Sequence, residues 1–72
     1  MTVSFAVRGE YIQLDQLLKA AGLVGTGGQA HAVVDSGLVT VDGKVESRKR
    51  AKLRPGARVR LGDEEILVVS GD

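Results

Sequence analysis

The chain has 72 residues, a length that suits one domain, predicted to span residues 1–72, with a thin hydrophobic core. It contains no cysteine and one histidine and has a formal net charge of +1, so we expect no disulfide, no metal site and no cofactor. No apolar run approaches 18 residues and no basic start precedes an apolar stretch, which predicts a cytoplasmic protein without a membrane span or secretory signal.

The first third of the chain predicts a strand followed by a helix. Residues 3–7 alternate in the way that is typical of a short strand. Four apolar residues with the spacing i, i+3, i+4, i+7 predict a helix over about residues 13–21, and Gly22 suits its left-handed C-terminal end. The apolar stripe of this helix consists of Leu14, Leu17, Leu18 and Ala21.

A second helix is predicted over about residues 27–36. Thr26 and Gln29 have the spacing of a capping box, in which the threonine caps the helix and the glutamine reaches back. The glycine-rich turn of residues 25–28 has two interpretations. It is either an N-cap turn whose glycines ease close packing, or an open helix N-terminus that holds a phosphate. The buried side of the helix is expected to be Ala30, Val33 and Val34, with Gly37 as its end.

The second half of the chain predicts strands joined by tight turns. Asp42-Gly43 is a strong signal for a type I′ hairpin turn, and Pro55-Gly56 marks another turn. The last strand is apolar almost throughout, which indicates a central or well-covered position. The expected strands are residues 38–41, 44–54, 58–61 and 65–69. The predicted fold is therefore α+β, with two helices packed on a small, mostly antiparallel sheet of four to five strands.

Residues 44–60, here called the basic segment, concentrate the positive charge of the molecule. They hold eight of the ten Lys and Arg residues and one acid, a charge of +7, whereas the rest of the chain carries −6. From residue 44 to 54 every even position is charged, which predicts an extended segment whose odd side chains face the core. Bases two residues apart on a strand lie about 6.6–6.8 Å apart, a spacing comparable to that of successive phosphates. The alternative is a solvated face that happens to be basic.

The ordered set of motifs resembles the S4 RNA-binding domain, also called the αL motif. The resemblance is carried by a Gln-Leu-Asp-x-Leu-Leu opening from Gln13, Gln-Ala-x-x-Val-Val from Gln29, Val-Asp-Gly-Lys ending at Lys44, and Pro55-Gly56. It covers about residues 12–61 and looks closest to small stand-alone bacterial members of the YbcJ-like group. It implies an αL-motif fold and non-enzymatic RNA binding.

Two departures from the family pattern shift the expected contacts. Many S4 domains have arginine where Gln13 stands and a Ser-Arg pair where Thr26-Gly27 stands, and those arginines usually face RNA. The main contacts are therefore expected from Arg48, Lys49, Arg50, Lys52 and Arg54, with Lys44, Arg58 and Arg60 as supporting charges. A weaker second set on the helices comprises Gln13, Thr26, Gly28, Gln29 and His31.

The predicted function is binding to the phosphate backbone of a structured RNA of ribosomal or transfer type, as a monomer, with the ribosome as a candidate partner. With Phe5 and Tyr11 as its aromatic residues, the chain is expected to offer no platform for stacking splayed bases, which favours shape and backbone readout. One alternative is an adaptor whose basic face docks on an acidic protein. His31 is expected to be partly exposed, either as a plain surface histidine or as a hydrogen-bonding partner of RNA. A hydrolase or transferase would need a catalytic group of side chains, which the spacing of the acids does not indicate.

Overall fold

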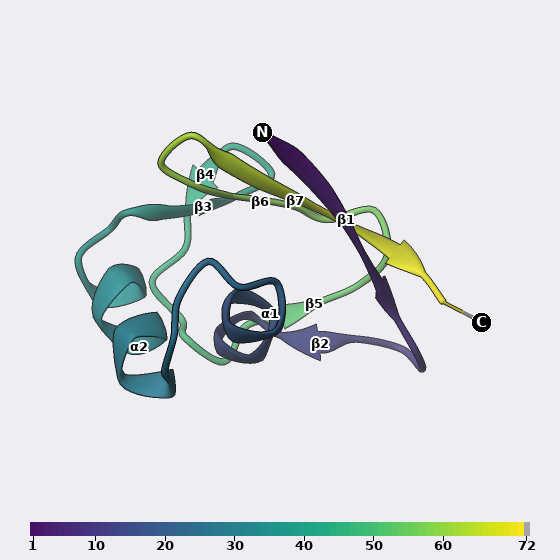
Figure 1. Ribbon diagram of the computed structural model, residues 1–72, viewed down its shortest axis with the longest axis horizontal. Coiled ribbons are helices and arrows are strands. Elements are labelled where there is room, and N and C mark those ends of the chain that lie inside the picture. The colour runs from purple at the N-terminus through teal and green to yellow at the C-terminus, as the bar shows by residue number, and fades with distance from the viewer. Residues whose placement is uncertain (72) are drawn as a thin grey trace.

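The computed structural model describes residues 1–71, so Asp72, the last residue of the predicted domain, lies outside the described part (Figure 1). Two helices and seven strands make up this part. They are β1 (Thr2–Val7), β2 (Ile12–Gln13), α1 (Leu14–Ala20), α2 (Gly27–Asp35), β3 (Val39–Val41), β4 (Lys44–Val45), β5 (Lys52–Leu53), β6 (Arg58–Leu61) and β7 (Glu64–Ser70). Neither helix in residues 1–71 combines the length and apolar composition needed to cross a membrane.

A five-stranded sheet in the order β1-β7-β6-β3-β4 forms one layer of the molecule. β1 pairs with β7 in parallel, and the other three pairs are antiparallel. The second layer contains both helices and a small antiparallel sheet of β2 and β5, which lie together on one side of the large sheet (Figure 1). The predicted α+β fold is therefore confirmed, as is the interior position of the last strand, while the small sheet was not predicted.

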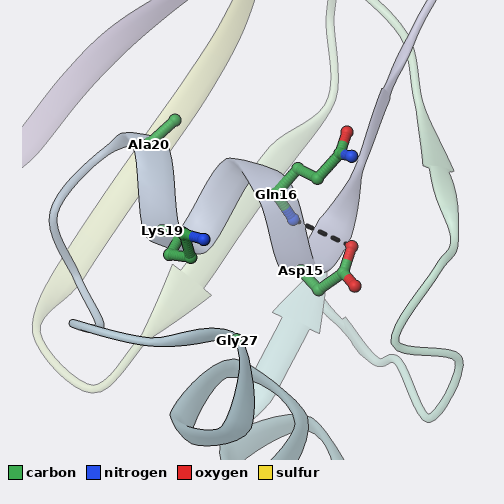
Figure 2. A pocket seen from close by; sticks show the side chains of 5 residues that line it. All are labelled: Asp15, Gln16, Lys19, Ala20 and Gly27. Atoms are coloured by element: carbon green, nitrogen blue, oxygen red, sulfur yellow. Dashed lines mark hydrogen bonds between the residues drawn. The ribbon is translucent and has the colours of Figure 1, made fainter.

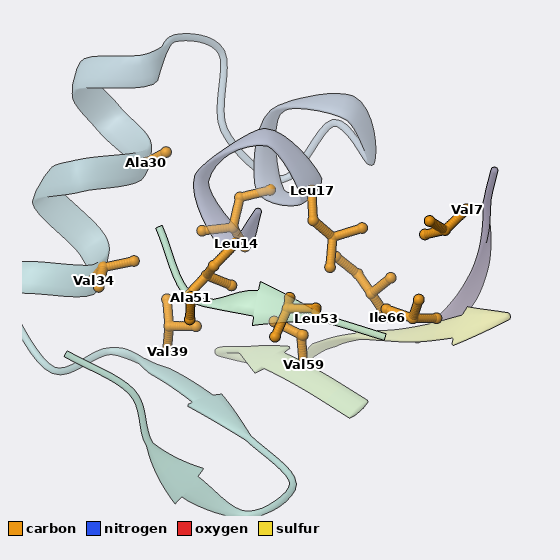
Figure 3. Close-up of a cluster of buried hydrophobic side chains, with 12 residues drawn as sticks. Val7, Leu14, Leu17, Ala30, Val34, Val39, Ala51, Leu53, Val59 and Ile66 are labelled. Atoms are coloured by element: carbon orange, nitrogen blue, oxygen red, sulfur yellow. The ribbon is translucent and has the colours of Figure 1, made fainter. Parts of the chain in front are cut away.

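The hydrophobic core lies between these two layers (Figure 3). Leu14, Leu17 and Leu18 of α1 are fully buried, as the helical spacing predicts. They meet strand residues that alternate between core and solvent, namely Val39, Val59, Ile66 and Val68. Ala30 and Val34 bring α2 into the same cluster. The core is thus built almost wholly from Leu, Val and Ala, and it fixes which face of each strand is exposed.

Local turn and cap geometry largely follows the sequence. Asp42 and Gly43 both have positive φ, 52° and 84°, as the type I′ turn requires. The Oγ1 of Thr26 accepts a 3.1 Å hydrogen bond from the backbone N–H of Gln29, which confirms the N-cap. The Gln29 side chain does reach back, but its Oε1 accepts from the N–H of Gly25 at 2.6 Å and not from that of Thr26.

The prediction of one extended strand over residues 44–54 is wrong. Residues 44–45 form β4 in the large sheet, residues 52–53 form β5 in the small sheet, and residues 46–51 form a loop between the layers. Val45, expected to face the core, is 63% exposed, whereas Ala51 and Leu53 are buried. The chain leaves the large sheet because its next apolar side chains are buried against the other layer.

Replacing Leu17 with alanine tests the core. We expect Leu17→Ala to lower the free energy of unfolding by about 2–5 kcal/mol, because a fully buried side chain is lost and a cavity is left. Val45→Ala is the control, and its effect should stay within about 0.5 kcal/mol because that side chain is 63% exposed. Urea denaturation followed by circular dichroism measures both. Equal losses in the two variants would contradict this core.

Candidate nucleic-acid interface

Residues 46–51, here called the basic loop, are attached to the start of α1 through the backbone. The N–H groups of Leu14 and Asp15 each donate a 2.9 Å hydrogen bond, to the carbonyl oxygens of Ala51 and Lys49 respectively. Gln13, the N-cap residue of α1, makes no side-chain capping bond. The loop carbonyls therefore satisfy helix donors that would otherwise lack an internal partner. Because these carbonyls point to the helix, the loop is held at a fixed place beside α1.

The strand that follows the loop is fixed by pairing and by burial. Ile12 pairs with Leu53 and Gln13 with Lys52 in the two-residue antiparallel ladder of β2 and β5. Leu53 is 3% exposed and faces the core. Side chains alternate along a strand, so Lys52 and Arg54 point away from the core, and both are exposed.

Arg48 is the one predicted main contact with a carboxylate partner in the described part of the chain. The carboxylate of Glu46 accepts from Arg48 Nε at 3.1 Å, from Nη2 at 3.1 Å and from the backbone N–H at 3.0 Å. The guanidinium hydrogen bonds, followed by the backbone N–H, lower the pKa of Glu46, and the same contact raises the pKa of Arg48. The Arg48 side chain nevertheless remains 78% exposed. Lys49, Arg50, Lys52 and Arg54 have no ion pair within residues 1–71.

The supporting charges lie elsewhere on the molecule. Arg58 and Arg60 flank the buried Val59 on β6, so they point to the face of the large sheet that is turned away from the helices. Arg58 is also paired with Glu65, with 3.4 Å between Nη1 and Oε1. Lys44 lies on the edge strand β4, opposite Val41. The fold therefore places the loop and β5 on backbone that is held against α1 and β2, and it directs Arg58 and Arg60 to the other face of the large sheet.

Most polar groups of the second set on the helices take part in the fold. Thr26 and Gln29 hold the start of α2. His31 is 34% exposed, as expected for a partly exposed side chain, but its Nε2 lies 3.1 Å from Asp15 Oδ2 and links α2 to α1. That link was not predicted. Gln13 is half-buried beside Lys52, and Gly28 is exposed in the first turn of α2.

Two hollows lie near these elements. A cavity of about 250 Å³ between α1 and the start of α2 is lined by Asp15, Gln16, Lys19, Ala20 and Gly27 (Figure 2). It combines one cation with one carboxylate, so it offers no excess of positive charge to a phosphate. A wider groove of about 590 Å³ follows β5 and the next turn, and its lining includes Lys52, Arg54 and Asp42. The described residues contain no group of three or more His, Asp or Glu side chains that could hold a metal ion.

Tyr11 lies beside the basic segment, a position that was not predicted. Its ring is partly exposed, and Lys52 Nζ lies 5.0 Å from the ring centroid. Its position in the sequence gives a weak signal, because Tyr11 directly precedes the apolar Ile12. Ile12 starts the strand that pairs with the basic segment at Leu53.

The chain matches known proteins along most of its length. The model of the S4 domain matches residues 5–69, a wider span than the expected 12–61. YbcJ of Escherichia coli (strain K12), whose name gives RNA binding only as a proposed activity, is 38% identical over 60 residues, 83% of this chain and 86% of YbcJ. YbcJ of Shigella flexneri, named as uncharacterized, matches with the same identity and coverage. A solution structure of YbcJ from E. coli, described as revealing an αL motif involved in RNA binding, superimposes with a TM-score of 0.69 and 36% identity, covering 96% of this chain and 86% of that one.

The contact between Glu46 and Arg48 predicts a pH dependence of the basic loop. Because the folded-state pKa of Glu46 is lowered, the contact is fully present above the ordinary pKa of a glutamate, about 4.3, and is lost as the pH falls through the lowered pKa. NMR titration of the side-chain carboxyl carbon of Glu46 measures this pKa. In Arg48→Gln it should rise toward the ordinary value, whereas Arg60→Gln should leave it unchanged. An ordinary pKa in the unmodified chain would show that the contact does not form.

Proposed function

The chain belongs to the S4 domain family, and on that premise we propose that it binds the phosphate backbone of a folded RNA, of ribosomal or transfer type, through the basic loop and β5. The contacting cations are Arg48, Lys49, Arg50, Lys52 and Arg54. The protein acts in this proposal as a monomer in the cytoplasm and without catalysis.

One observation carries the proposal: four cations close together in the chain project from a backbone that is tied to the core, and none of them forms an ion pair with a carboxylate of residues 1–71. Lys49, Arg50, Lys52 and Arg54 are exposed and have no ion pair within residues 1–71. Unpaired like charges repel one another, and a polyanion removes this repulsion while it releases its own counterions. Since the backbone is already fixed by α1 and β2, little ordering of the chain is needed on binding.

Folded RNA fits this surface better than an extended single strand. Proteins that bind single strands stack successive bases on several aromatic side chains. Phe5 packs against the core here, which leaves Tyr11 as the single aromatic side chain beside the cations. Contacts to phosphates give affinity and orientation but little sequence information, so recognition would depend on the shape of the RNA backbone.

Binding to a folded RNA should weaken steeply with salt. With about five phosphates neutralised, affinity should fall by roughly two to three decades between 50 and 200 mM salt. Lys52→Ser/Arg54→Ser should weaken binding and reduce the slope of log K against log salt by about 2, since each lost phosphate contact removes about 1. Fluorescence anisotropy with a labelled RNA hairpin measures both quantities.

Arg58→Ser/Arg60→Ser is the matched control, because it removes the same charge from the opposite face of the molecule. Its salt slope should stay closer to that of the unmodified chain than the slope of Lys52→Ser/Arg54→Ser. Identical slopes for the two double variants would mean that net charge, and not the proposed contact surface, determines binding.

The second candidate function is an adaptor whose cations dock on an acidic protein, and the same unpaired charges favour it. Isolating the chain from cells with and without ribonuclease separates the two. RNA binding predicts that the partners are lost after ribonuclease treatment, and sequencing of the crosslinked RNA would identify them. A protein partner that survives the treatment, and that Lys52→Ser/Arg54→Ser abolishes, would establish the adaptor.

A further inference from the structure

We propose that Tyr11 forms a stacking site for one unpaired nucleobase at the edge of the basic surface, a role that rests on the RNA binding proposed above. The ligand is a nucleotide whose base is not paired within a folded RNA, such as a bulged residue. Its phosphate would contact Lys52 or Arg54, and its base would lie on the Tyr11 ring.

The pairing of β2 with β5 determines where the ring lies. Ile12 and Leu53 are direct partners, and both side chains turn to the core. Tyr11 precedes Ile12 and Arg54 follows Leu53, so alternation directs both away from the core, onto the face that also carries Lys52. Diagonal neighbours on one face of an antiparallel pair are within reach of long and aromatic side chains. The 5.0 Å distance between Lys52 Nζ and the Tyr11 centroid is this diagonal contact.

The ring is accessible, and its position is fixed by the fold. Tyr11 is 39% exposed, whereas the other aromatic residue, Phe5, packs against the core. A cation over an exposed ring is held by about 0.5–1 kcal/mol, which is weak enough for a phosphate to displace it. When a phosphate draws the ammonium of Lys52 away, the ring face that it covered becomes free for the base of the same nucleotide.

Lys52 connects the ring to a neighbouring groove. Its ammonium contacts the Tyr11 ring, and its side chain also lines the groove of about 590 Å³, whose lining includes Asp42 but not Tyr11. Arg54 lines the same groove and supplies a second cation for the sugar-phosphate chain. A single ring accommodates one base, which agrees with a folded RNA that presents one unpaired nucleotide. An acidic peptide would engage the two cations, but a carboxylate has no flat apolar face to stack on tyrosine.

The chain carries its own probe for this site, because Tyr11 is its one tyrosine and it has no tryptophan. Intrinsic tyrosine emission therefore reports on Tyr11 alone. Two RNA hairpins would be compared that differ at a single position, a bulged adenosine in one and an abasic residue in the other. Both carry the same phosphates. We expect the hairpin with the bulged adenosine to quench Tyr11 emission more strongly than the abasic hairpin does. It should also bind at least about fivefold more tightly, since stacking of one base on an aromatic ring supplies a difference of that size.

Substitutions separate stacking from phosphate contact. Tyr11→Leu should bind the two hairpins equally, with the salt slope unchanged, and Tyr11→Phe should retain the preference because the ring is kept. Thermal unfolding of both variants shows whether each is folded. A preference that persists in folded Tyr11→Leu, or its absence in the unmodified chain, would overturn the stacking site and leave the proposed RNA binding intact. Failure of the unmodified chain to bind either hairpin would overturn both, and binding of an acidic peptide in their place would favour the adaptor.

Discussion

Backbone hydrogen bonds between the start of α1 and the basic loop are the constraint on which the charged surface depends. The donors are the N–H groups of Leu14 and Asp15, and the acceptors are the carbonyls of Ala51 and Lys49. A hydrogen bond of this kind contributes about 0.5–1.5 kcal/mol net, and an unsatisfied donor at a helix terminus would cost more. The same bonds orient the loop: because its carbonyls face the helix, the cationic side chains around them are left to project into solvent.

Two buried apolar side chains, Ala51 and Leu53, anchor the basic segment in the hydrophobic core. Ala51 and Leu53 are 6% and 3% exposed, and they are the points at which the basic segment enters the hydrophobic cluster between the layers. Their burial opposes the repulsion among the neighbouring cations, which would otherwise favour a detached, extended loop. Glu46 reduces the repulsion at the loop entrance by holding Arg48 through three hydrogen bonds. The cations at the far end of the loop and on β5 have no carboxylate partner within residues 1–71.

The sequence predicts the structure correctly where neighbouring residues determine the local conformation. The apolar spacing of α1, the Thr26 cap of α2 and the Asp42-Gly43 turn each depend on residues close in the chain, and all three are found. The prediction of one strand over residues 44–54 was wrong because alternation shows which side of a strand is exposed to solvent, but not which sheet the strand joins. β2 and β5 have two residues each, too few for a periodic pattern. The acceptors for the first N–H groups of α1 come from residues more than thirty positions away, because the N-cap residue Gln13 makes no side-chain capping bond.

Polar residues at the starts of both helices take part in the fold. Gln13 pairs with Lys52 across the small sheet, and Thr26 caps α2. Asp15 is likewise occupied, since it binds His31 across the helix pair. The polar groups at the helix starts therefore serve the packing of the helices, and the cations of the loop and β5 lie on backbone that the start of α1 and β2 hold in place. In the proposed complex, a backbone held by hydrogen bonds would carry exposed, long cationic side chains, which could adjust to the course of an RNA backbone while the underlying fold stays unchanged.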